Sequence, residues 1–341
     1  MNNLKKGEFK VDMSIMKLIR KTLPFIITRI IIYALFGLAA LVFLGIVIGI
    51  GLLLANMFGE SSFAFILVMI IALGVVFGGL RFVERYVLYM VKMGHVAAIV
   101  ELLQTGKIPE GKGMVAYGKE KVTENFGASN VAFVLDKMVK AAVRQIQRWI
   151  MRIGNIFSFI PGSKNIIGII NAIMSVSLNY IDEAIMSYIF LRKSEKQEET
   201  VWKSASDGVV LYAQSWKGII KAAIGSVVFI YVLTFILFLG FVFPLMFVSN
   251  IVAGDTEGLG FFLGYIAIIG AIILTTMVKR ALVDPIVTII MIRSYQISIR
   301  DLEPAMDLQQ KLLGISSRFK RLFNKAQEEE ASSTPPPAAQ N

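Results

Sequence analysis

Few side chains of this chain are placed to do chemistry, and those few lie at or inside long apolar runs. Glu84 and Asp284 follow such runs, and Arg29 lies near the start of the first one. Ionisable groups at membrane depth are the usual functional candidates, so we consider these three as residues of an ion or solute pathway. The structural alternative is that they form ion pairs at the inner ends of the helices. Tyr231 and Tyr265 lie within apolar runs, where a tyrosine ring either contacts a cation or packs.

Catalytic and metal-binding constellations are missing from the sequence. It contains no cysteine and one histidine, His95, which excludes a thiolate nucleophile, a disulfide framework and a cysteine-ligated metal. A zinc site would have to combine carboxylates with one imidazole. The neighbours of His95 place it on the surface of a helix. We predict a protein with no catalytic residue, no metal and no cofactor, and not an enzyme.

Two apolar regions organise the chain. Residues 222–278 contain no lysine or arginine, and residues 30–80 contain only one charged residue, Glu60. Each apolar run reaches the roughly 20 residues that a helix needs to cross a bilayer. We therefore expect an all-α integral membrane protein with four transmembrane helices in two hairpins and cytoplasmic or interfacial amphipathic helices between them. The expected spans are 25–57, 63–82, 224–248 and 259–278.

The charge distribution predicts the orientation. All 35 lysines and arginines lie outside 30–80 and 222–278, and the net charge is +11. Basic segments stay on the inner side of a membrane, so we expect a multi-pass protein of the cell (inner or plasma) membrane with both termini in the cytoplasm. Attraction to anionic lipids accounts for the positive charge, and we expect no nucleic-acid partner.

Composition divides the chain into six segments. These are a cytoplasmic N-terminal segment with an amphipathic helix (1–24), the first hairpin (25–93), a helical connector (94–215), the second hairpin (216–293), a C-terminal helix (294–326) and a disordered tail (327–341).

The connector contains the clearest amphipathic helix, Val131–Ile153. Its cations recur every four residues, and they are Lys140, Arg144, Arg148 and Arg152. Apolar residues cover the other side, and Trp149 lies among them. This pattern is typical of a helix in the membrane boundary whose basic face contacts lipid headgroups. Packing on the rest of the protein is the alternative, and both can hold together.

Two further segments give mixed signals. Ile166–Leu191 is apolar but broken by polar residues, so we interpret it as a half-buried or re-entrant helix that returns against Val131–Ile153. The helix of the fourth span continues past Asp284, and Pro285 is expected to kink it because proline removes a donor.

The hairpins share weak regularities. At an offset of 200, Glu84 aligns with Asp284, which a parallel duplication would explain. Glycines four residues apart allow close helix contacts, within one chain or between subunits. The pairs are Gly45/Gly49, Gly74/Gly78 and Gly260/Gly264. Since four spans enclose little space, we expect a homo-oligomer.

The C-terminal half also resembles a known family. The segments that carry the resemblance are IDEAIMSYIFLRKSEKQEETVWKSASDGVVLYAQSWKGIIKAAI, FILFLGFVFP and ALVDPIVTIIMIRSYQISIRDLEP. In order and length they are similar to the closing part of the choline transporter-like family, over about Val131–Glu303. Members of that family have more spans and cysteine-bearing outer loops. The resemblance implies a membrane transport protein and assigns no binding residue.

Two functions fit these features. The first is an oligomeric transporter or channel-like permease of unknown substrate. The second is a non-transporting protein that organises the membrane or recruits a partner through basic interfacial helices. A continuous polar passage between the spans favours the first, and a dry bundle packed through glycines favours the second.

Overall fold

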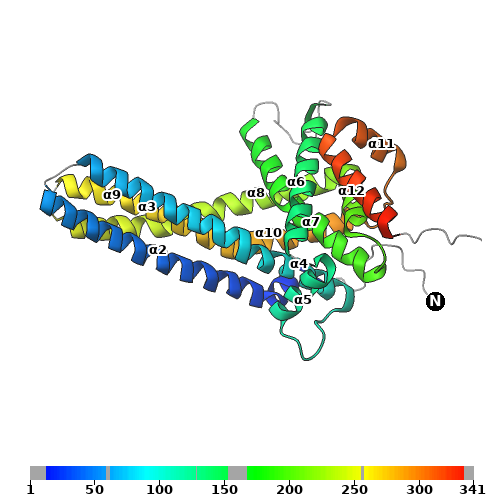
Figure 1. Cartoon of the computed structure of the whole chain (residues 1–341), viewed down its shortest axis with the longest axis horizontal. Coiled ribbons are helices and arrows are strands. Elements are labelled where there is room, and N and C mark those ends of the chain that lie inside the picture. The colour runs from blue at the N-terminus through cyan, green and yellow to red at the C-terminus, as the bar shows by residue number, and fades with distance from the viewer. Residues whose placement is uncertain (1–12, 59–61, 128, 153–166, 255–256, 334–341) are drawn as a thin grey trace, which may run out of the picture. The chain divides into compact units, whose positions relative to one another are not determined.

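The computed structural model describes residues 13–58, 62–127, 129–152, 167–254 and 257–333. These residues form helices joined by turns, and none of them belongs to a β-strand (Figure 1). The helices are α1 (Ile15–Lys21), α2 (Leu23–Phe58), α3 (Ser62–Val83), α4 (Tyr89–Thr105), α5 (Met114–Phe126), α6 (Ser129–Arg152), α7 (Ile167–Glu195), α8 (Val201–Ala253), α9 (Glu257–Val278), α10 (Asp284–Ile299), α11 (Met306–Ile315) and α12 (Ser317–Ser333). Two π-helical turns, η1 (Glu84–Leu88) and η3 (Lys279–Val283), interrupt this order.

The described residues divide into two compact units. Residues 24–92 and 233–284 form unit 2, which corresponds to most of the two predicted hairpins. Residues 13–23, 93–232 and 285–333 form unit 1. The predicted N-terminal segment, connector and C-terminal helix therefore contribute to one folded unit.

Three helical segments are long and apolar enough to cross a membrane. They are Leu23–Val47, Val201–Ala253 and Gly260–Ile299, the last of which runs continuously through α9, η3 and α10. In α3 the apolar stretch recognised among the described residues, Ile70–Val83, is shorter than a span. A fourth span and the pairing of the spans into hairpins stay predictions.

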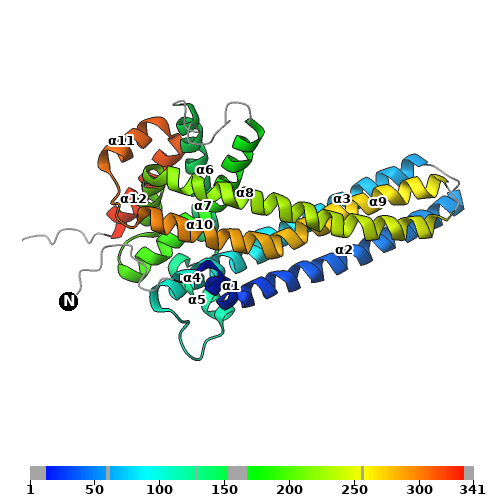
Figure 2. The same ribbon diagram turned by 180° about the vertical axis from the view of Figure 1, so that it is seen from behind.

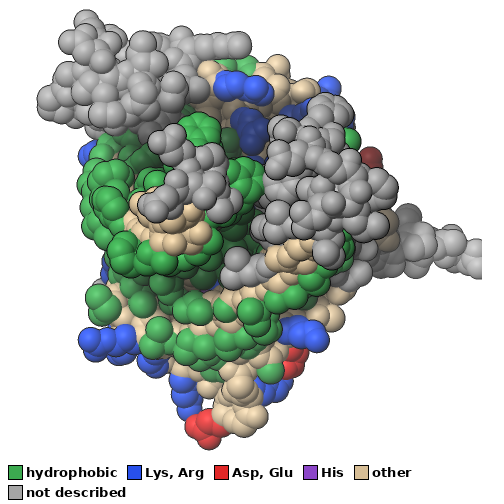
Figure 3. Space-filling model, turned by 90° about the vertical axis from the view of Figure 1, so that its left-hand side faces the viewer, with side chains coloured by type: hydrophobic (Ala, Val, Ile, Leu, Met, Phe, Trp, Pro, Cys, Tyr) green, Lys and Arg blue, Asp and Glu red, His purple; other side chains and the backbone are tan. Residues whose placement is uncertain are grey.

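Large apolar side chains cover the outside of the unit 2 helices. Leu35 is 63% exposed, Ile70 62% and Phe261 70%. Figure 3 shows hydrophobic side chains over the described helices at the end of unit 2 that faces the viewer. Water-soluble proteins rarely expose such extended apolar patches, so this surface suits the hydrocarbon of a bilayer.

The core of unit 2 gathers around Tyr33. Its ring packs in one cluster with Leu80 of α3, Leu88 of η1 and Met277 of α9. Glycines make two of the close approaches, because a Cβ at Gly79 would lie 3.2 Å from the Phe36 ring and a Cβ at Gly37 would lie 3.1 Å from Met277 Cε. The two apolar regions of the sequence thus meet at this cluster.

The predicted glycine contacts occur in one pair of the three. The second part of α8 and α9 run side by side (Figure 2), and Cβ atoms at Gly260 and Gly264 would lie 3.5 Å from Ala253 and 3.8 Å from Met246. Cβ atoms at Gly45, Gly49, Gly74 and Gly78 would meet no other described atom within 4 Å. These two pairs do not pack against another helix in the part of the chain that the structure describes.

A π-helical turn lies where the sequence predicts a proline kink. In η3 the Asp284 N–H donates to the Lys279 carbonyl oxygen, five residues earlier, and Pro285 follows at once. Proline deletes a helical donor and crowds the preceding turn, and a π-helical turn is a common form of the resulting irregularity. The turn η1 occupies the corresponding place in the other apolar region, although no proline follows it.

Unit 1 packs its helices around α4 and α6. Along α4, residues 93–100 are all buried, and His95 is 0% exposed. The expectation that His95 lies on a helix surface was wrong, because neighbours enclose α4 on every side at this level. Helix α6 packs against α5, α7 and α12. The predicted return of the segment after residue 166 against Val131–Ile153 is thereby confirmed for the described residues of α7.

The terminal segments of unit 1 are helical as well. Ser14 caps α1 by accepting a hydrogen bond from the Lys17 N–H, and Lys21 Nζ donates to the Gly106 carbonyl oxygen over 2.7 Å. At the other end, α12 continues through Ser333. The boundary predicted at residue 326 for a disordered tail was therefore too early, since helix α12 passes it; residues 334–341 lie outside the described residues.

Candidate functional site

The first candidate group lies in unit 2, beside the Tyr33 cluster. Lys279 Nζ lies 2.7 Å from Asp284 Oδ1, so the carboxylate predicted as a pathway residue has an ion-pair partner one π-helical turn away. Arg29 is only 6% exposed, and Arg29, Arg280 and Asp284 all lie close enough to act electrostatically on the Tyr33 hydroxyl. These groups come from two segments that lie far apart in sequence, 29–33 and 279–284, and they meet beside the Tyr33 cluster.

The other pathway candidates do not join this group in the described structure. Tyr231 is 58% exposed and Tyr265 54% exposed, and the Tyr265 ring packs edge-on against Phe261. Both rings therefore face outward among apolar side chains, as packing or lipid contact requires. The backbone of Glu84 opens η1, but its side chain lies outside the described residues.

The second candidate group is the basic face of α6. Val139, Val143 and Ile146 are completely buried, because α5, α7 and α12 cover the apolar side of the helix. These apolar residues therefore pack on the protein itself, which was the alternative to membrane contact. Lipid contact through the basic face stays a prediction.

The four predicted cations of α6 separate into different environments. Lys140 Nζ lies 3.3 Å from Oδ2 of Asp182, a buried residue of α7. This lysine is therefore paired within unit 1. Arg144 and Arg148 are exposed. Trp149 lies beneath Lys311 Nζ, 5.2 Å from the ring centroid, and the side chain of Arg152 lies outside the described residues.

Helix α12 adds cations that sequence analysis did not connect with α6. A groove of about 530 Å³ runs between the two helices, with Val134 and Met138 of α6 on one side. Lys320, Arg321 and Lys325 of α12 line the other side, together with Glu328. Val134 and Arg148 are two heptads apart and so share a face of α6. We call Arg144, Arg148, Lys320 and Arg321 the basic surface.

The basic surface is free of ion pairs in the residues that the structure describes. Arg144, Arg148, Lys320 and Arg321 are all exposed, and none of them pairs with a described carboxylate. Exposed cations without a protein partner are available to an anionic ligand. Repeated lysine and arginine in 318–325 were the sequence signal for the α12 half.

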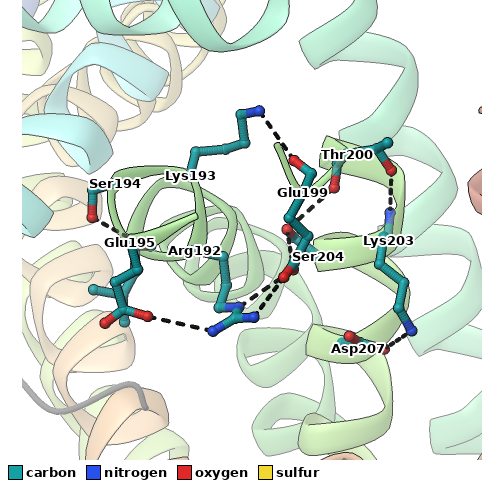
Figure 4. Close-up of polar contacts among 10 residues, drawn as sticks. Arg192, Lys193, Ser194, Glu195, Glu199, Thr200, Lys203, Ser204 and Asp207 are labelled. Carbon is teal, nitrogen blue, oxygen red and sulfur yellow. Dashed lines mark hydrogen bonds and ion pairs between the residues drawn. The ribbon is translucent and has the colours of Figure 1, made fainter. Parts of the chain in front are cut away.

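A third group, which the sequence analysis did not single out, joins α7 to α8 in unit 1 (Figure 4). Glu199 accepts hydrogen bonds from the Arg192 guanidinium and, over 2.8 Å, from the Ser204 hydroxyl. Arg192 Nη1 also donates to Glu195 over 3.4 Å. We call Arg192, Glu195, Glu199 and Ser204 the Glu199 cluster.

Electrostatics keep Glu199 charged. Burial by itself raises the pKa of this carboxyl, but the hydrogen bonds from Arg192 and Ser204 outweigh burial and hold the pKa below its ordinary value. Lys193 Nζ closes the same turn by donating to the backbone oxygens of Gln197 and Glu199. The connection between α7 and α8 is thus held by charge-assisted hydrogen bonds.

Polar side chains also cross the interior of unit 1. Gln147 of α6 donates to the Tyr212 hydroxyl over 2.8 Å, and Gln296 of α10 donates to the Ser187 hydroxyl over 3.0 Å. Thr288 donates to the buried Glu183 carboxylate. Buried polar groups require such partners, and these bonds align α6, α7, α8 and α10.

The chain was compared with protein-family models, with curated proteins and with solved structures. No protein-family model, curated protein or solved structure matches it. The described residues define an all-helical protein with three helices that are long and apolar enough to cross a membrane.

Proposed function

We propose that the protein is a non-transporting, membrane-organising protein that is anchored in the bilayer. Its unit 1 binds anionic lipid headgroups through the basic surface. The apolar helices of unit 2 would hold the chain in the bilayer, and unit 1 would lie on the cytoplasmic side, as the charge distribution predicts. The observation that carries this proposal is the set of four exposed cations, Arg144, Arg148, Lys320 and Arg321, on the two helices that border the groove.

The groove suits a phospholipid better than a simple anion. Its apolar side chains, Val134 and Met138, face the basic residues of α12, and Val134 is 47% exposed. An anionic phospholipid offers a phosphate to the cations and a glyceryl and acyl portion to the apolar side. Each cation near an anionic surface contributes about 1 kcal/mol to such binding.

The proposal is tested by native mass spectrometry on the full-length protein in detergent mixed with phosphatidylglycerol or phosphatidylcholine. We expect preferential binding of phosphatidylglycerol, weakened about tenfold or more in Arg144→Glu with Arg148→Glu, because two favourable contacts become repulsive. Lys107→Glu with Lys119→Glu is the matched control, since both lysines are exposed in the 106–121 region. Equal loss in both double variants would contradict the basic surface as the binding site.

Solute transport is a second candidate. The observation in its favour is the cluster of Lys279, Asp284 and buried Arg29 beside Tyr33, which places several charges within unit 2. Buried charges within membrane segments commonly mark pathways. Flux into proteoliposomes that disappears in Glu84→Gln with Asp284→Asn would support transport, and vesicles that stay sealed to a broad solute panel would remove it.

A further inference from the structure

The basic surface consists of two pairs of cations, one on each of two helices. Arg144 and Arg148 lie four residues apart on α6, so they occupy successive turns of one helix face. Lys320 and Arg321 lie near the start of α12, which begins at Ser317. All four cationic side chains are exposed, so a ligand can reach both pairs.

A hydrogen-bonded junction holds the start of α12 beside this part of α6. Gln145 Oε1 accepts hydrogen bonds from the Ser316 hydroxyl and from the Arg318 N–H, each over 3.1 Å. Ser316 also caps α12, because its hydroxyl oxygen accepts from the Phe319 N–H over 3.0 Å. Gln145 lies between the two arginines of α6, and Phe319 directly precedes the two cations of α12. The junction therefore holds the two pairs near each other before any ligand binds, which lowers the free-energy cost of binding.

Positive charge is in excess at this junction. Glu328 is the one carboxylate among the described residues that line the groove, and it lies seven residues beyond Arg321, about 10 Å along the helix axis. Asp136, the one acid of α6, is buried and lies eight residues before Arg144, about 12 Å along the axis. A phosphodiester group carries one negative charge, so a single phosphate leaves most of the charge of the four cations unbalanced.

The apolar part of the groove continues from the same junction. Met138 and Val134 line the groove and lie seven and eleven residues before Gln145, about two and three helical turns, so the three side chains share a face of α6. A ligand with its phosphates at the junction therefore meets hydrocarbon surface further along α6. A free phosphate ester has nothing to place there, whereas a lipid has its glyceryl and acyl portions.

We infer that the basic surface selects an anionic lipid whose headgroup carries two phosphates, as a cardiolipin does. One phosphate contacts Arg144 and Arg148, the other contacts Lys320 and Arg321, and the hydrocarbon portion lies against Met138. Arginine and lysine side chains bind phosphate oxygens through charge-assisted hydrogen bonds. This inference rests on the proposed function, because it specifies the class of lipid that the same site binds.

The test compares dilysocardiolipin with phosphatidylglycerol by native mass spectrometry on the full-length protein in detergent. Both lipids carry two acyl chains, but the first has two phosphates and the second has one. We expect the Kd for dilysocardiolipin to be about tenfold lower or more, because its second phosphate gains two further cations. Fully deacylated cardiolipin, which keeps both phosphates and has no acyl chain, should bind at least about tenfold more weakly than dilysocardiolipin.

A double variant locates the second phosphate. Lys320→Gln with Arg321→Gln should raise the Kd for dilysocardiolipin about tenfold and that for phosphatidylglycerol less than about threefold, because the arginines of α6 stay. Its unfolding temperature should remain near that of wild type, since both side chains are exposed and neither pairs with a described carboxylate. Lys107→Gln with Lys119→Gln, which removes two exposed lysines outside the groove, should keep the wild-type preference.

The outcomes separate this inference from the proposed function. Equal affinity of wild type for the two lipids, with both weakened in Arg144→Glu with Arg148→Glu, would overturn the two-phosphate selection and leave the proposed function standing. No preference for either anionic lipid over phosphatidylcholine would overturn both. A dilysocardiolipin preference that survives Lys320→Gln with Arg321→Gln also overturns the inference, as does deacylated cardiolipin that binds as tightly as dilysocardiolipin.

Discussion

Arg192 binds Glu199 through two donors, Nε at 3.3 Å and Nη2, although the residues are seven positions apart. The pair spans the turn between α7 and α8, and both side chains are mostly buried, at 9% and 13% exposure. Because α7 and α8 also hold Asp182 and Tyr212 against α6, this pair fixes a junction that positions several helices of unit 1.

Replacing Arg192 by methionine should destabilise unit 1 by about 2–3 kcal/mol, because the mostly buried carboxylate loses charged hydrogen bonds. Thermal unfolding followed by tryptophan fluorescence measures this, since all three tryptophans, Trp149, Trp202 and Trp216, belong to unit 1. Arg300→Met is the control, because Arg300 lies 3.8 Å from Asp301 and both are over half exposed. Exposed pairs contribute about 0–1 kcal/mol, so an equal effect of the two variants would contradict the assigned role.

The stability of unit 1 should depend on the ionisation of Glu199. Its folded-state pKa lies below the unfolded value, which is about 4.3. The stabilisation is therefore complete above the unfolded pKa and is lost as the pH falls through the folded pKa. Glu199→Gln should lower the unfolding temperature at pH 7, and its difference from wild type should shrink towards pH 3. A difference that stays constant over this range would argue against the charged pair.

A side chain at Gly208 should disturb the packing of α8 against α7. A Cβ there would lie 3.0 Å from Ile185 Cγ2 and 3.2 Å from Tyr188 Cδ1. Such overpacking costs about 1–3 kcal/mol, so Gly208→Ala should unfold at a lower temperature. Gly225→Ala in the same helix meets nothing within 4 Å and should be neutral or gain up to about 1 kcal/mol in helix propensity. The prediction fails if the two variants unfold alike.

Single-cysteine labelling should reveal the orientation, because the natural chain has no cysteine. With unit 1 in the cytoplasm, Gly113→Cys should resist a membrane-impermeant maleimide in intact cells and react after permeabilisation. Asn250→Cys, near the far end of α8 and exposed, should react without permeabilisation. The reverse pattern would overturn the orientation derived from the positive charges.

The glycines without a contact are expected to serve an interface between copies of the chain. Gly45→Ile with Gly49→Ile should reduce cross-linked oligomer in membranes, because bulky residues prevent close approach of helix backbones. Gly225→Ile, also clear of other atoms, controls for added bulk. Unchanged cross-linking in the double variant would assign the Gly45/Gly49 stripe to lipid contact instead.

Much of the fold could be derived from local patterns. Long apolar runs without cations predict membrane helices because each run must satisfy its own backbone in lipid, and three such helices are present. The cation spacing in 140–152 likewise predicted α6, because charges four residues apart share a helix face. Pro285 predicted an irregularity in the helix, but one proline does not indicate that the irregularity is a π-helical turn.

The partners of these side chains were decided by tertiary structure. Helical spacing places Lys140 on the same basic face as Arg144, but the lysine donates a hydrogen bond to Asp182, 42 residues away. The cations of α12 reach the groove beside α6 only because the C-terminal helix folds back onto the connector. Helical periodicity is a short-range property that one segment carries by itself. Which helices meet depends on burying their apolar faces together, and that is settled only by the whole chain.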